Sequence, residues 1–358
     1  MKIEELQVRK DDLSATRMAA AEAPSLKDGE VLAKVEAFAL TANNITYGVV
    51  GEQIGYWKFF PAADGWGIIP AWGFAEIVES RCGGVSAGER LYGYFPMASH
   101  LVMTPTKIRP ERLIDGAAHR SGLPPVYNTY ARVAGEPGYD RAMDDERMLL
   151  FPLYATSFCL YDFLLDNDWF GAARVIVASA SSKTAIGLAY ALHDDADAPS
   201  SIGLTSARNK SKVGALRLYD DVAVYDDIAS IDAKAPAMIV DMSGDRAMLG
   251  TLAAHLGDAM RYCLHVGVTH HEANDGALPV GRERSSFFFA PGHIQKRTAD
   301  WGPGVFETKA LNFWRDAAKR SRGWLSIEKV GGAAAVEDVF HRLREGKISP
   351  DCGVVASL

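Results

Sequence analysis

The chain has 358 residues, a length that indicates two domains rather than one small module. Hydrophobic residues make up 48% and charged residues 23%, the balance of a globular protein with a sizeable core, which excludes a disordered, collagen-like or coiled-coil chain. The 38 Lys and Arg residues against 45 Asp and Glu give a net charge of −7 without any basic block, so nucleic acid is not an expected partner.

The chain begins with an acidic pair, Glu4 and Glu5, where a secretory signal would need an apolar run, and no window approaches the ~18 apolar residues of a membrane span. We therefore expect a cytoplasmic protein without a membrane partner. The four cysteines are far apart and form neither a zinc-type pair nor a disulfide framework, so we expect buried thiols.

The first hundred residues contain short apolar stretches separated by turn signals. The expected strands are 31–37, 73–79 and 89–94, and their rhythm is typical of an antiparallel, barrel-like region. The stretch 105–146 has no clear period and contains Pro124-Pro125, so we interpret it as a connection with little structure of its own.

From about residue 174 the pattern changes to short apolar runs that alternate with helical stretches. This alternation predicts βαβ units on a doubly wound parallel sheet. The expected strands are 175–178, 202–205, 222–225, 238–241 and 262–266, with a sixth apolar run at 287–290. Helices are expected at 184–193 and 246–255, and the tail, with helices near 306–320 and 336–345 and a strand at 353–356, is expected to fold back onto the N-terminal region.

This order, together with the segments 29–32 (Gly-Glu-Val-Leu) and 84–91 (Gly-Val-Ser-Ala-Gly-Glu-Arg-Leu), resembles the medium-chain dehydrogenase/reductase superfamily. The resemblance implies an α/β chain with a GroES-like catalytic domain of the β-barrel type over 1–130, completed by 300–358, and a Rossmann dinucleotide-binding domain over 131–299. It also implies a homodimer, because members of the superfamily often pair through an edge of the Rossmann sheet.

The segment 39–48 is similar to the quinone oxidoreductase and enoyl reductase branches, which keep an Asn, an Asp and a Tyr near the nicotinamide. The resemblance implies Tyr47 as the group that donates to a developing enolate or phenolate oxygen, with Asn44 and Thr46 positioning the substrate or the ribose. A structural tyrosine in an aromatic core is the alternative. The segments 70–73, 288–291 and 300–302 indicate a divergent branch.

The zinc motifs of the superfamily are missing. Thr41 falls near the position of the catalytic Cys, and neither the Gly-His-Glu motif nor the lobe with four cysteines is present. A hydroxyl is a poor zinc ligand compared with a thiolate or an imidazole, so we expect a zinc-independent protein without a metal site. Clustering of His265 with His270, His271 and Glu272 leaves metal binding there as an alternative.

The turn after the first Rossmann strand has lost its glycines. The positions that hold Gly, Gly and Gly or Ala in relatives are Ser179, Ser182 and Ala185 here, which indicates a reshaped turn or lost cofactor binding. Phosphate can still be held at a helix N-terminus by hydroxyl and backbone donors, and the candidates are Ser181, Ser182, Lys183 and Thr184. A helix cap without a ligand is the alternative.

The second Rossmann strand ends without the carboxylate of NAD-binding relatives. Ser206, Arg208 and Lys210 stand there instead, and two cations favour the 2′-phosphate of NADPH over NADH, with a solvated loop as the alternative. Further cofactor contacts are expected at later strand ends, where glycines also have purely structural uses: Ser243, Gly244, Gly267, Thr269 and Phe289.

These observations predict an NADP(H)-dependent oxidoreductase that transfers a hydride to an activated C=C bond or a quinone. The many aromatic residues between 47 and 127 indicate a small apolar substrate, although such residues also fill cores. Two alternatives stay open: an NADPH-dependent carbonyl reductase, and a non-enzymatic binding or structural relative that has lost cofactor turnover.

Overall fold

The computed structural model describes every residue except 54, 268–279 and 289. The chain divides into two compact units, the first formed by Met1–Leu149 with Leu325–Leu358 and the second by Leu150–Trp324. The sequence placed these junctions at 130/131 and 299/300. The observed junctions lie further along the chain than the expected ones. The first falls inside one continuous helix, α3 (Asp144–Asp166), and the second follows α8 (Val305–Ser321), which belongs to the second unit rather than to the first.

The first unit is built mainly from antiparallel strands. A three-stranded sheet has the order β2-β1-β4, and a larger one has the order β17-β18-β3-β5-β6-β10-β9-β8, with β7 paired to β3. Its elements are β1 (Lys2–Arg9), β2 (Thr16–Glu22), β3 (Val31–Leu40), α1 (Ala42–Val49), β4 (Trp66–Gly67), β5 (Pro70–Ser80), β6 (Arg90–Pro96), β7 (His100–Met103), β8 (Pro105–Thr106), β9 (Arg112–Asp115), α2 (Pro125–Asn128), β10 (Thr129–Arg132), β17 (Ser326–Gly331), α9 (Ala333–Arg344) and β18 (Cys352–Ser357).

The hydrophobic core of this unit accounts for the position of its central strands. β3, β5 and β6 carry inward apolar residues such as Phe38, Ile77 and Leu91, and they pair antiparallel as the sequence predicted. The stretch 105–146 is not a structureless connection, because β9 and β10 within it extend the same sheet from β6. Each of these strands has only four residues, too few to show a clear period in the sequence.

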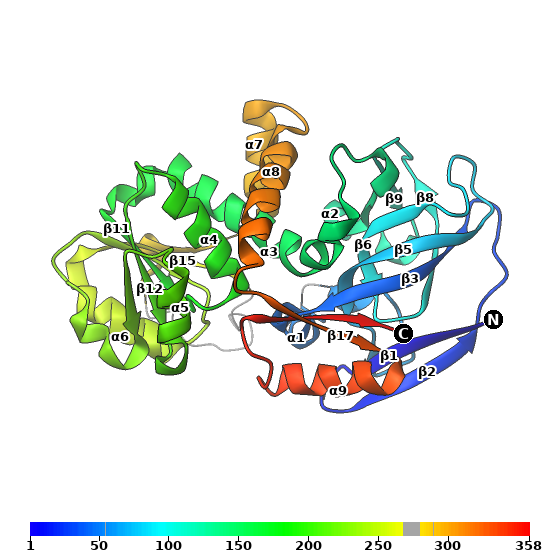
Figure 1. Cartoon of the computed structure of the whole chain (residues 1–358), viewed down its shortest axis with the longest axis horizontal. Coiled ribbons are helices and arrows are strands. Elements are labelled where there is room, and N and C mark those ends of the chain that lie inside the picture. Colours follow the sequence, from blue (N-terminus) through cyan, green and yellow to red (C-terminus); the bar gives the residue numbers. More distant parts are fainter. Residues whose placement is uncertain (54, 268–279, 289) are drawn as a thin grey trace. The chain divides into compact units, whose positions relative to one another are not determined.

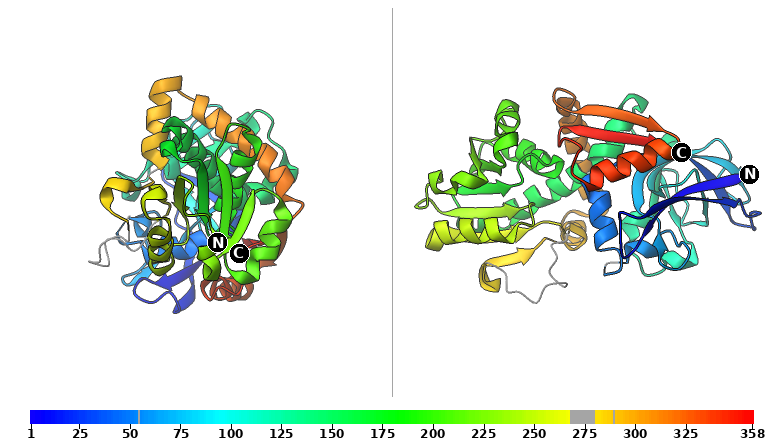
Figure 2. Two further views of the ribbon diagram at one scale, coloured as in Figure 1. Left: turned by 90° about the vertical axis from the view of Figure 1, so that its left-hand side faces the viewer. Right: turned by 90° about the horizontal axis from the view of Figure 1, so that it is seen from below.

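The end of the chain completes this unit only in part. β18 pairs with β3 as expected, and α9 places Val336, Val339 and Phe340 in the same core, running alongside β17 and β18 (Figure 2). The expected return of the helix near 306–320 is wrong, because α8 packs Phe306 and Ala310 against Cys159 in the second unit.

The second unit is a parallel sheet of order β13-β12-β11-β14-β15-β16 between helices (Figure 1). All five strands predicted between 175 and 266 are present, and the fold class is confirmed. The sixth strand lies at Ser285–Phe287, so only Phe287 of the apolar run 287–290 belongs to it, and Ala290 already begins a helix. The elements are β11 (Arg174–Ala178), α4 (Lys183–Asp194), β12 (Ser200–Thr205), α5 (Lys210–Leu216), β13 (Asp221–Val224), β14 (Ala237–Asp241), α6 (Arg246–Leu256), β15 (Met260–His265), β16 (Ser285–Phe287) and α7 (Ala290–Trp301), with α3 and α8.

Successive side chains of β11 pack against helices on opposite faces of the sheet. Ile176 and Ala178 pack with the apolar side of α6, whereas Val175 and Val177 pack with α3 and α4. Because side chains of a strand alternate between faces, this continuous apolar run requires cover on both sides.

Helix α3 corrects one expectation from the sequence. The stretch Arg141–Asp166 is long and apolar enough to cross a membrane by length and composition alone, although no such segment was expected. More than half of its most apolar window is buried inside the structure, and Leu160 and Leu164 belong to the core under the sheet. A buried core helix needs the same composition.

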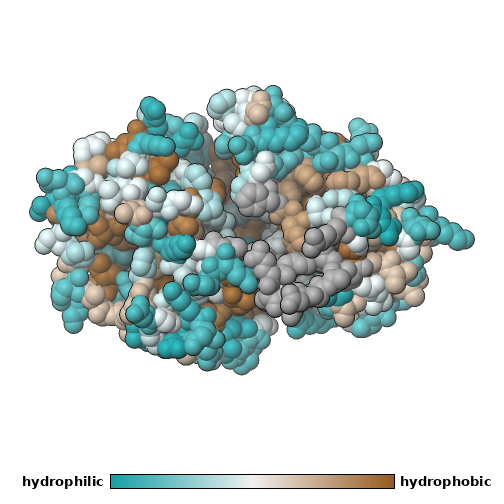
Figure 3. Space-filling model, turned by 180° about the vertical axis from the view of Figure 1, so that it is seen from behind, coloured by the Kyte–Doolittle hydropathy of each residue, from teal (hydrophilic) through white to brown (hydrophobic). Residues whose placement is uncertain are grey.

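The surface carries both hydrophilic and apolar residues. On the face shown in Figure 3, hydrophilic and apolar residues are interspersed. The exposed large apolar side chains come from separate elements, among them Val49 of α1, Val126 of α2 and Leu165 of α3.

Two helical glycines predict opposite effects of the same substitution. A Cβ at Gly187 in α4 would lie 2.4 Å from Ser157 Oγ and 2.6 Å from the Tyr154 ring, whereas one at Gly214 in α5 would meet nothing within 4 Å. We expect Gly187→Ala to lower the free energy of unfolding by about 1–3 kcal/mol through overpacking. Gly214→Ala should raise it by up to about 1 kcal/mol, because alanine is the better helix former. Urea denaturation of both variants checks this, and equal effects would contradict the close contact of α3 and α4.

Candidate functional site

Strand ends of the parallel sheet gather most of the predicted cofactor residues on one edge. The chain proceeds from β11 outward to β12 and β13, then crosses to β14 on the other side of β11, so the winding reverses between β11 and β14. Ligands bind beyond the carboxyl ends of strands at such a reversal. The residues that follow these ends are Ser179–Ser182 after β11, Ser206 after β12, Ser243 and Gly244 after β14, and Gly267 after β15.

The turn after β11 keeps a glycine-like backbone without glycine. Ser179 has φ +61°, in the left-handed region that glycine adopts at little cost, and its N–H donates to the Tyr225 hydroxyl at 3.2 Å. Ser182 caps α4 by accepting from the Ala185 N–H at 3.3 Å. The loss of glycine has therefore not removed the left-handed turn. Tyr225 is a contributor that sequence reasoning missed, since nothing near it in the sequence marks it.

The end of β12 presents both paired and unpaired hydroxyls. Ser181 Oγ accepts from Asn209 Nδ2 at 3.1 Å and lies 3.5 Å from the Thr205 hydroxyl, which ties the first turn to the second strand. The Ser206 hydroxyl is buried and has no hydrogen-bond partner within the described part of the chain. Arg208 and Lys210 beside it are exposed. Asn209 is a second residue that the sequence analysis did not single out.

The ends of β14 and β15 hold a buried carboxylate and an imidazole. Asp241 Oδ1 accepts from the Ser243 N–H at 2.9 Å and from its hydroxyl at 2.6 Å, and Oδ2 lies 3.6 Å from His265 Nδ1. Burial by itself would raise the pKa of Asp241, but the contacts from His265 and Ser243 outweigh it and lower the pKa. Sequence reasoning saw Asp241 only as a strand end, and the pairing with His265 required the register of β14 and β15.

Two of the predicted glycines lie in turns at this edge. Gly244 and Gly267 have positive φ values of 67° and 87°, which supports the structural use of glycine at both turns. The predicted residues Thr269 and Phe289 lie outside the described residues.

The residues at this edge fit a phosphorylated dinucleotide. A buried hydroxyl without a partner costs about 1–3 kcal/mol, and a polar ligand group at Ser206 would supply the missing bond. A Cβ at Gly267 would meet no atom of the described residues within 4 Å. Lys183 in the first turn of α4 and Arg208 after β12 bring positive charge to positions suited to phosphates.

The predicted catalytic residues of the first unit lie on α1. The Asn44 side chain is buried and caps this helix: its Oδ1 accepts from the Thr41 N–H at 2.7 Å, and its Nδ2 donates to the Pro70 carbonyl at 2.9 Å. Thr46 Oγ1 lies 3.5 Å from the Ala42 carbonyl within the helix. The geometry thus gives Asn44 a structural task, whereas Tyr47 faces other aromatic rings.

Tyr47 belongs to a cluster of aromatic residues from separate parts of the first unit. Its ring centroid lies 4.5 Å from that of Tyr56 and 6.0 Å from that of Tyr94, and the Tyr56 and Tyr127 hydroxyls are 3.1 Å apart. Burial raises the pKa of Tyr47, so its phenol stays protonated at neutral pH and serves as a hydrogen-bond donor. We call this set, Tyr47, Tyr56, Phe59, Trp72, Tyr94 and Tyr127, the aromatic cluster.

The structure describes the state of the four cysteines and the grouping of possible metal ligands. All four cysteines are free, Cys159 and Cys263 are buried, and Cys82 and Cys352 are half-buried rather than buried as expected. Among the described residues, no three His, Cys, Asp or Glu side chains gather as metal ligands. His270, His271 and Glu272 lie outside the described residues, so zinc independence stays a prediction.

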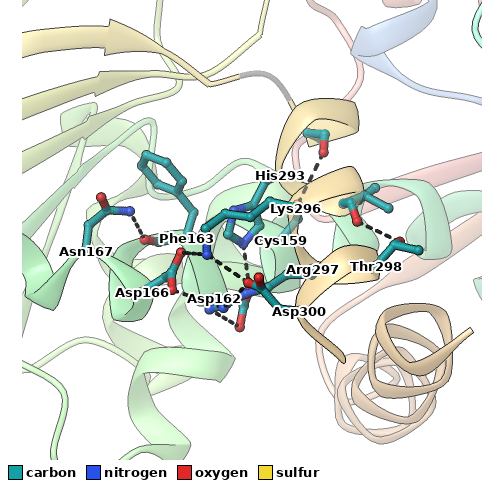
Figure 4. A network of polar contacts seen from close by, with 12 residues as sticks. Cys159, Asp162, Phe163, Asp166, Asn167, His293, Lys296, Arg297, Thr298 and Asp300 are labelled. Atoms are coloured by element: carbon teal, nitrogen blue, oxygen red, sulfur yellow. Dashed lines mark hydrogen bonds and ion pairs between the residues drawn. The ribbon is translucent and has the colours of Figure 1, made fainter. Parts of the chain in front are cut away.

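A buried ion-pair network fixes α7, the helix that follows β16, onto α3 (Figure 4). Asp162 Oδ2 lies 2.5 Å from His293 Nε2 and 2.5 Å from Arg297 Nε, and Arg297 Nη1 also lies 3.0 Å from Asp166. Burial alone would raise the pKa of Asp162, but hydrogen bonds from His293 and Arg297 outweigh it and lower the pKa.

A GroES-like β unit joined to a Rossmann sheet is the fold of the medium-chain dehydrogenase/reductase superfamily, so the resemblance seen in the sequence is confirmed at the level of the fold. The chain belongs to the family described as protein of unknown function (DUF2855), whose model matches residues 38–349. None of the curated proteins compared with the chain matches it.

Solved structures similar to this chain share its fold at low sequence identity. The quinone oxidoreductase from Coxiella burnetii has a TM-score of 0.57 at 13% identity, with 100% of each chain covered. CurA from Vibrio vulnificus in complex with NADPH has a TM-score of 0.61 at 12% identity, covering 99% of this chain and 98% of that one. TarJ from S. aureus in complex with NADPH has a TM-score of 0.57 at 10% identity, covering 100% and 99%.

Proposed function

We propose that the protein is an NADPH-dependent, zinc-independent oxidoreductase that reduces an activated C=C bond or a quinone of a small apolar substrate. The observation that carries the proposal is the end of β12, where a buried Ser206 hydroxyl without a described partner stands beside the exposed Arg208 and Lys210. A ribose with a 2′-phosphate matches this combination of hydrogen-bonding and positive groups. The ribose of NADH is instead typically bound by a carboxylate at this position. Bound NADPH supplies the hydride.

The chain's own residues have distinct tasks in this proposal. The Ser182-capped first turn of α4, with Lys183, binds the pyrophosphate, since helix N-termini favour anions. Arg208 binds the 2′-phosphate. In the first unit, the protonated Tyr47 phenol donates to the oxygen of the acceptor on which negative charge develops.

The comparisons support the cofactor part of the proposal only through likeness of fold. CurA and TarJ were each solved with NADPH, and the Coxiella burnetii protein is named a quinone oxidoreductase. The aromatic cluster supports an apolar acceptor, because flat rings pack favourably against flat rings. A homodimer in the cytoplasm remains part of the proposal by resemblance.

A melting experiment tests the cofactor assignment. NADPH at 100 times its Kd should stabilise the folded protein by about 2.7 kcal/mol, which corresponds to a Tm increase of roughly 5 °C or more. NADH at the same concentration should raise Tm by much less. Equal Tm values with NADPH, with NADH and without a nucleotide would overturn the enzyme proposal and favour a relative without cofactor turnover.

Replacing Arg208 by Gln sharpens the same test. Loss of one charge-assisted bond to a phosphate should weaken NADPH binding by about 10-fold or more and leave NADH binding unchanged. Isothermal titration calorimetry measures both affinities. The control is Arg217→Gln, which removes an exposed cation at the end of α5, away from the end of β12. If Arg208→Gln keeps the affinity for NADPH, Arg208 does not bind the 2′-phosphate.

A further inference from the structure

The Tyr94 side chain is the feature of the first unit that packing alone does not explain. Tyr94 stands on β6 and is fully buried, yet its hydroxyl has no hydrogen-bond partner within the described part of the chain. More than nine in ten buried polar groups in native proteins are hydrogen-bonded, and an unmade bond costs about 1–3 kcal/mol. A phenylalanine at position 94 would fill the same space without the cost of an unmade hydrogen bond. The neighbouring Phe59 is an example of such a ring in the same cluster.

The rings that surround Tyr94 are less deeply buried than Tyr94 itself. Its ring centroid lies 4.8 Å from that of Tyr127, 5.2 Å from that of Trp72 and 6.0 Å from that of Tyr47. These three neighbours are half-buried, whereas Tyr94 itself is not exposed at all. A ligand that displaces these half-buried rings therefore reaches the fully buried Tyr94 within the aromatic cluster.

The same surroundings define the chemistry of such a ligand. Aromatic walls favour a flat, apolar ring. Burial raises the pKa of Tyr94 well above its usual value, so the hydroxyl keeps its proton and donates. The nearby Tyr56 and Tyr127 hydroxyls already bond to each other at 3.1 Å, whereas the Tyr94 hydroxyl is free to donate to a new acceptor, alongside Tyr47.

We infer that the aromatic cluster is a binding site for a flat, uncharged ring that bears a carbonyl group, and that the Tyr94 hydroxyl determines specificity by donating to the carbonyl oxygen. This inference deepens the proposed function, on which it rests for the identity of the bound molecule as the hydride acceptor. The unpartnered hydroxyl is then a cost in the free protein that ligand binding removes.

A matched pair of small probes tests the inference without cofactor or turnover. 1-Indanone and indane share one ring skeleton and differ by the carbonyl oxygen. We expect calorimetry to show that the wild type binds 1-indanone about fivefold more tightly than indane, the effect of one hydrogen bond. Tyr94→Phe should abolish this preference while keeping indane binding. Equal affinities of the wild type for both probes, absence of binding, or a preference that survives in Tyr94→Phe would overturn the inference.

Stability supplies the second readout, and Tyr92 supplies the control. Tyr94→Phe should be at least as stable to urea as the wild type, because it removes a hydroxyl that has no partner. Tyr92 lies two residues away on β6, and its hydroxyl donates to the Arg147 carbonyl at 3.3 Å. Tyr92→Phe should therefore lose some stability and keep the preference for 1-indanone. If Tyr94→Phe is destabilised by more than about 1 kcal/mol, the hydroxyl has a permanent partner and the inference is wrong.

Failure here is distinguishable from failure of the proposed function. The probes bind in the absence of NADPH, whereas the cofactor assignment is decided by the nucleotide-dependent Tm. A Tyr94-dependent preference without any NADPH effect would retain the binding site and reject the oxidoreductase.

Discussion

Replacing Asp162 by Asn is expected to lower the free energy of unfolding of the second unit by about 3 kcal/mol. Asp162 is buried between α3 and α7, where it accepts from both His293 and Arg297. Removing one partner of a buried ion pair typically costs about 3–5 kcal/mol, because the remaining charge loses its compensation. The lower end applies because Arg297 also contacts Asp166 at 3.0 Å and Asp300 at 3.3 Å.

The same substitution should change how stability depends on pH. The pKa of Asp162 is lower in the folded protein than its usual value, so the folded state binds fewer protons than the unfolded state as the carboxylate titrates. The contribution of Asp162 to the free energy of unfolding is therefore complete above about pH 5, and it is lost as the pH falls through the pKa of the folded state. We expect the difference between wild type and Asp162→Asn to be largest at pH 7 and to shrink below about pH 4.

Urea denaturation at pH 7 and at pH 3.5 measures both effects. The control is Asp300→Asn, which removes a more exposed carboxylate of the same network, at 2.8 Å from Lys296. Exposed pairs contribute about 0–1 kcal/mol, so this variant should stay close to the wild type. Equal losses in both variants would show that Asp162 does not hold α7 through its buried charge.

The second large effect concerns catalysis. Under the proposed function, Tyr47→Phe should lower the rate of hydride transfer to an enone such as 2-cyclohexenone by about 100-fold. Removing one donor to a developing oxyanion typically costs 10²–10³-fold in turnover. The NADPH-dependent increase in Tm should persist, because Tyr47 belongs to the first unit and the proposed cofactor residues belong to the second.

Stopped-flow oxidation of NADPH measures the rate, and product analysis identifies the bond that is reduced. A saturated ketone supports reduction of the C=C bond, whereas an allylic alcohol would favour the carbonyl reductase. Tyr139→Phe is the control, since its hydroxyl contacts Asp144 at 2.8 Å outside the aromatic cluster. Full turnover in Tyr47→Phe would remove Tyr47 from the reaction and return it to a structural role.

Local patterns predicted the parallel sheet well. The runs at 175–178 and 238–241 are strands of the Rossmann sheet within one residue at the start, because strands buried on both faces read as unbroken apolar stretches. By contrast, β9 and β10 were missed, and α8 was assigned to the wrong unit. Four-residue strands carry little periodicity, and an amphipathic helix records that one face is buried without recording the surface that covers it.

The candidate site divides in the same way. Serine, lysine and arginine residues after β11 and β12 were visible in the sequence because strand ends and helix starts have local signals. The sequence analysis did not identify the bond from Ser179 to Tyr225, the contact of Asp241 with His265 or the unpartnered Tyr94 hydroxyl. Each depends on residues far apart in the chain that only strand register or helix packing brings together.

The sequence by itself therefore determined the two-part architecture, the order of the Rossmann strands along the chain and the loss of glycine and zinc motifs. Only the tertiary structure decided that Ser179 keeps a left-handed turn and that Asn44 caps α1. It also decided which polar groups are left without partners. The reason is physical: periodicity and capping act over a few residues, whereas burial and hydrogen-bond satisfaction depend on every segment that packs around a side chain.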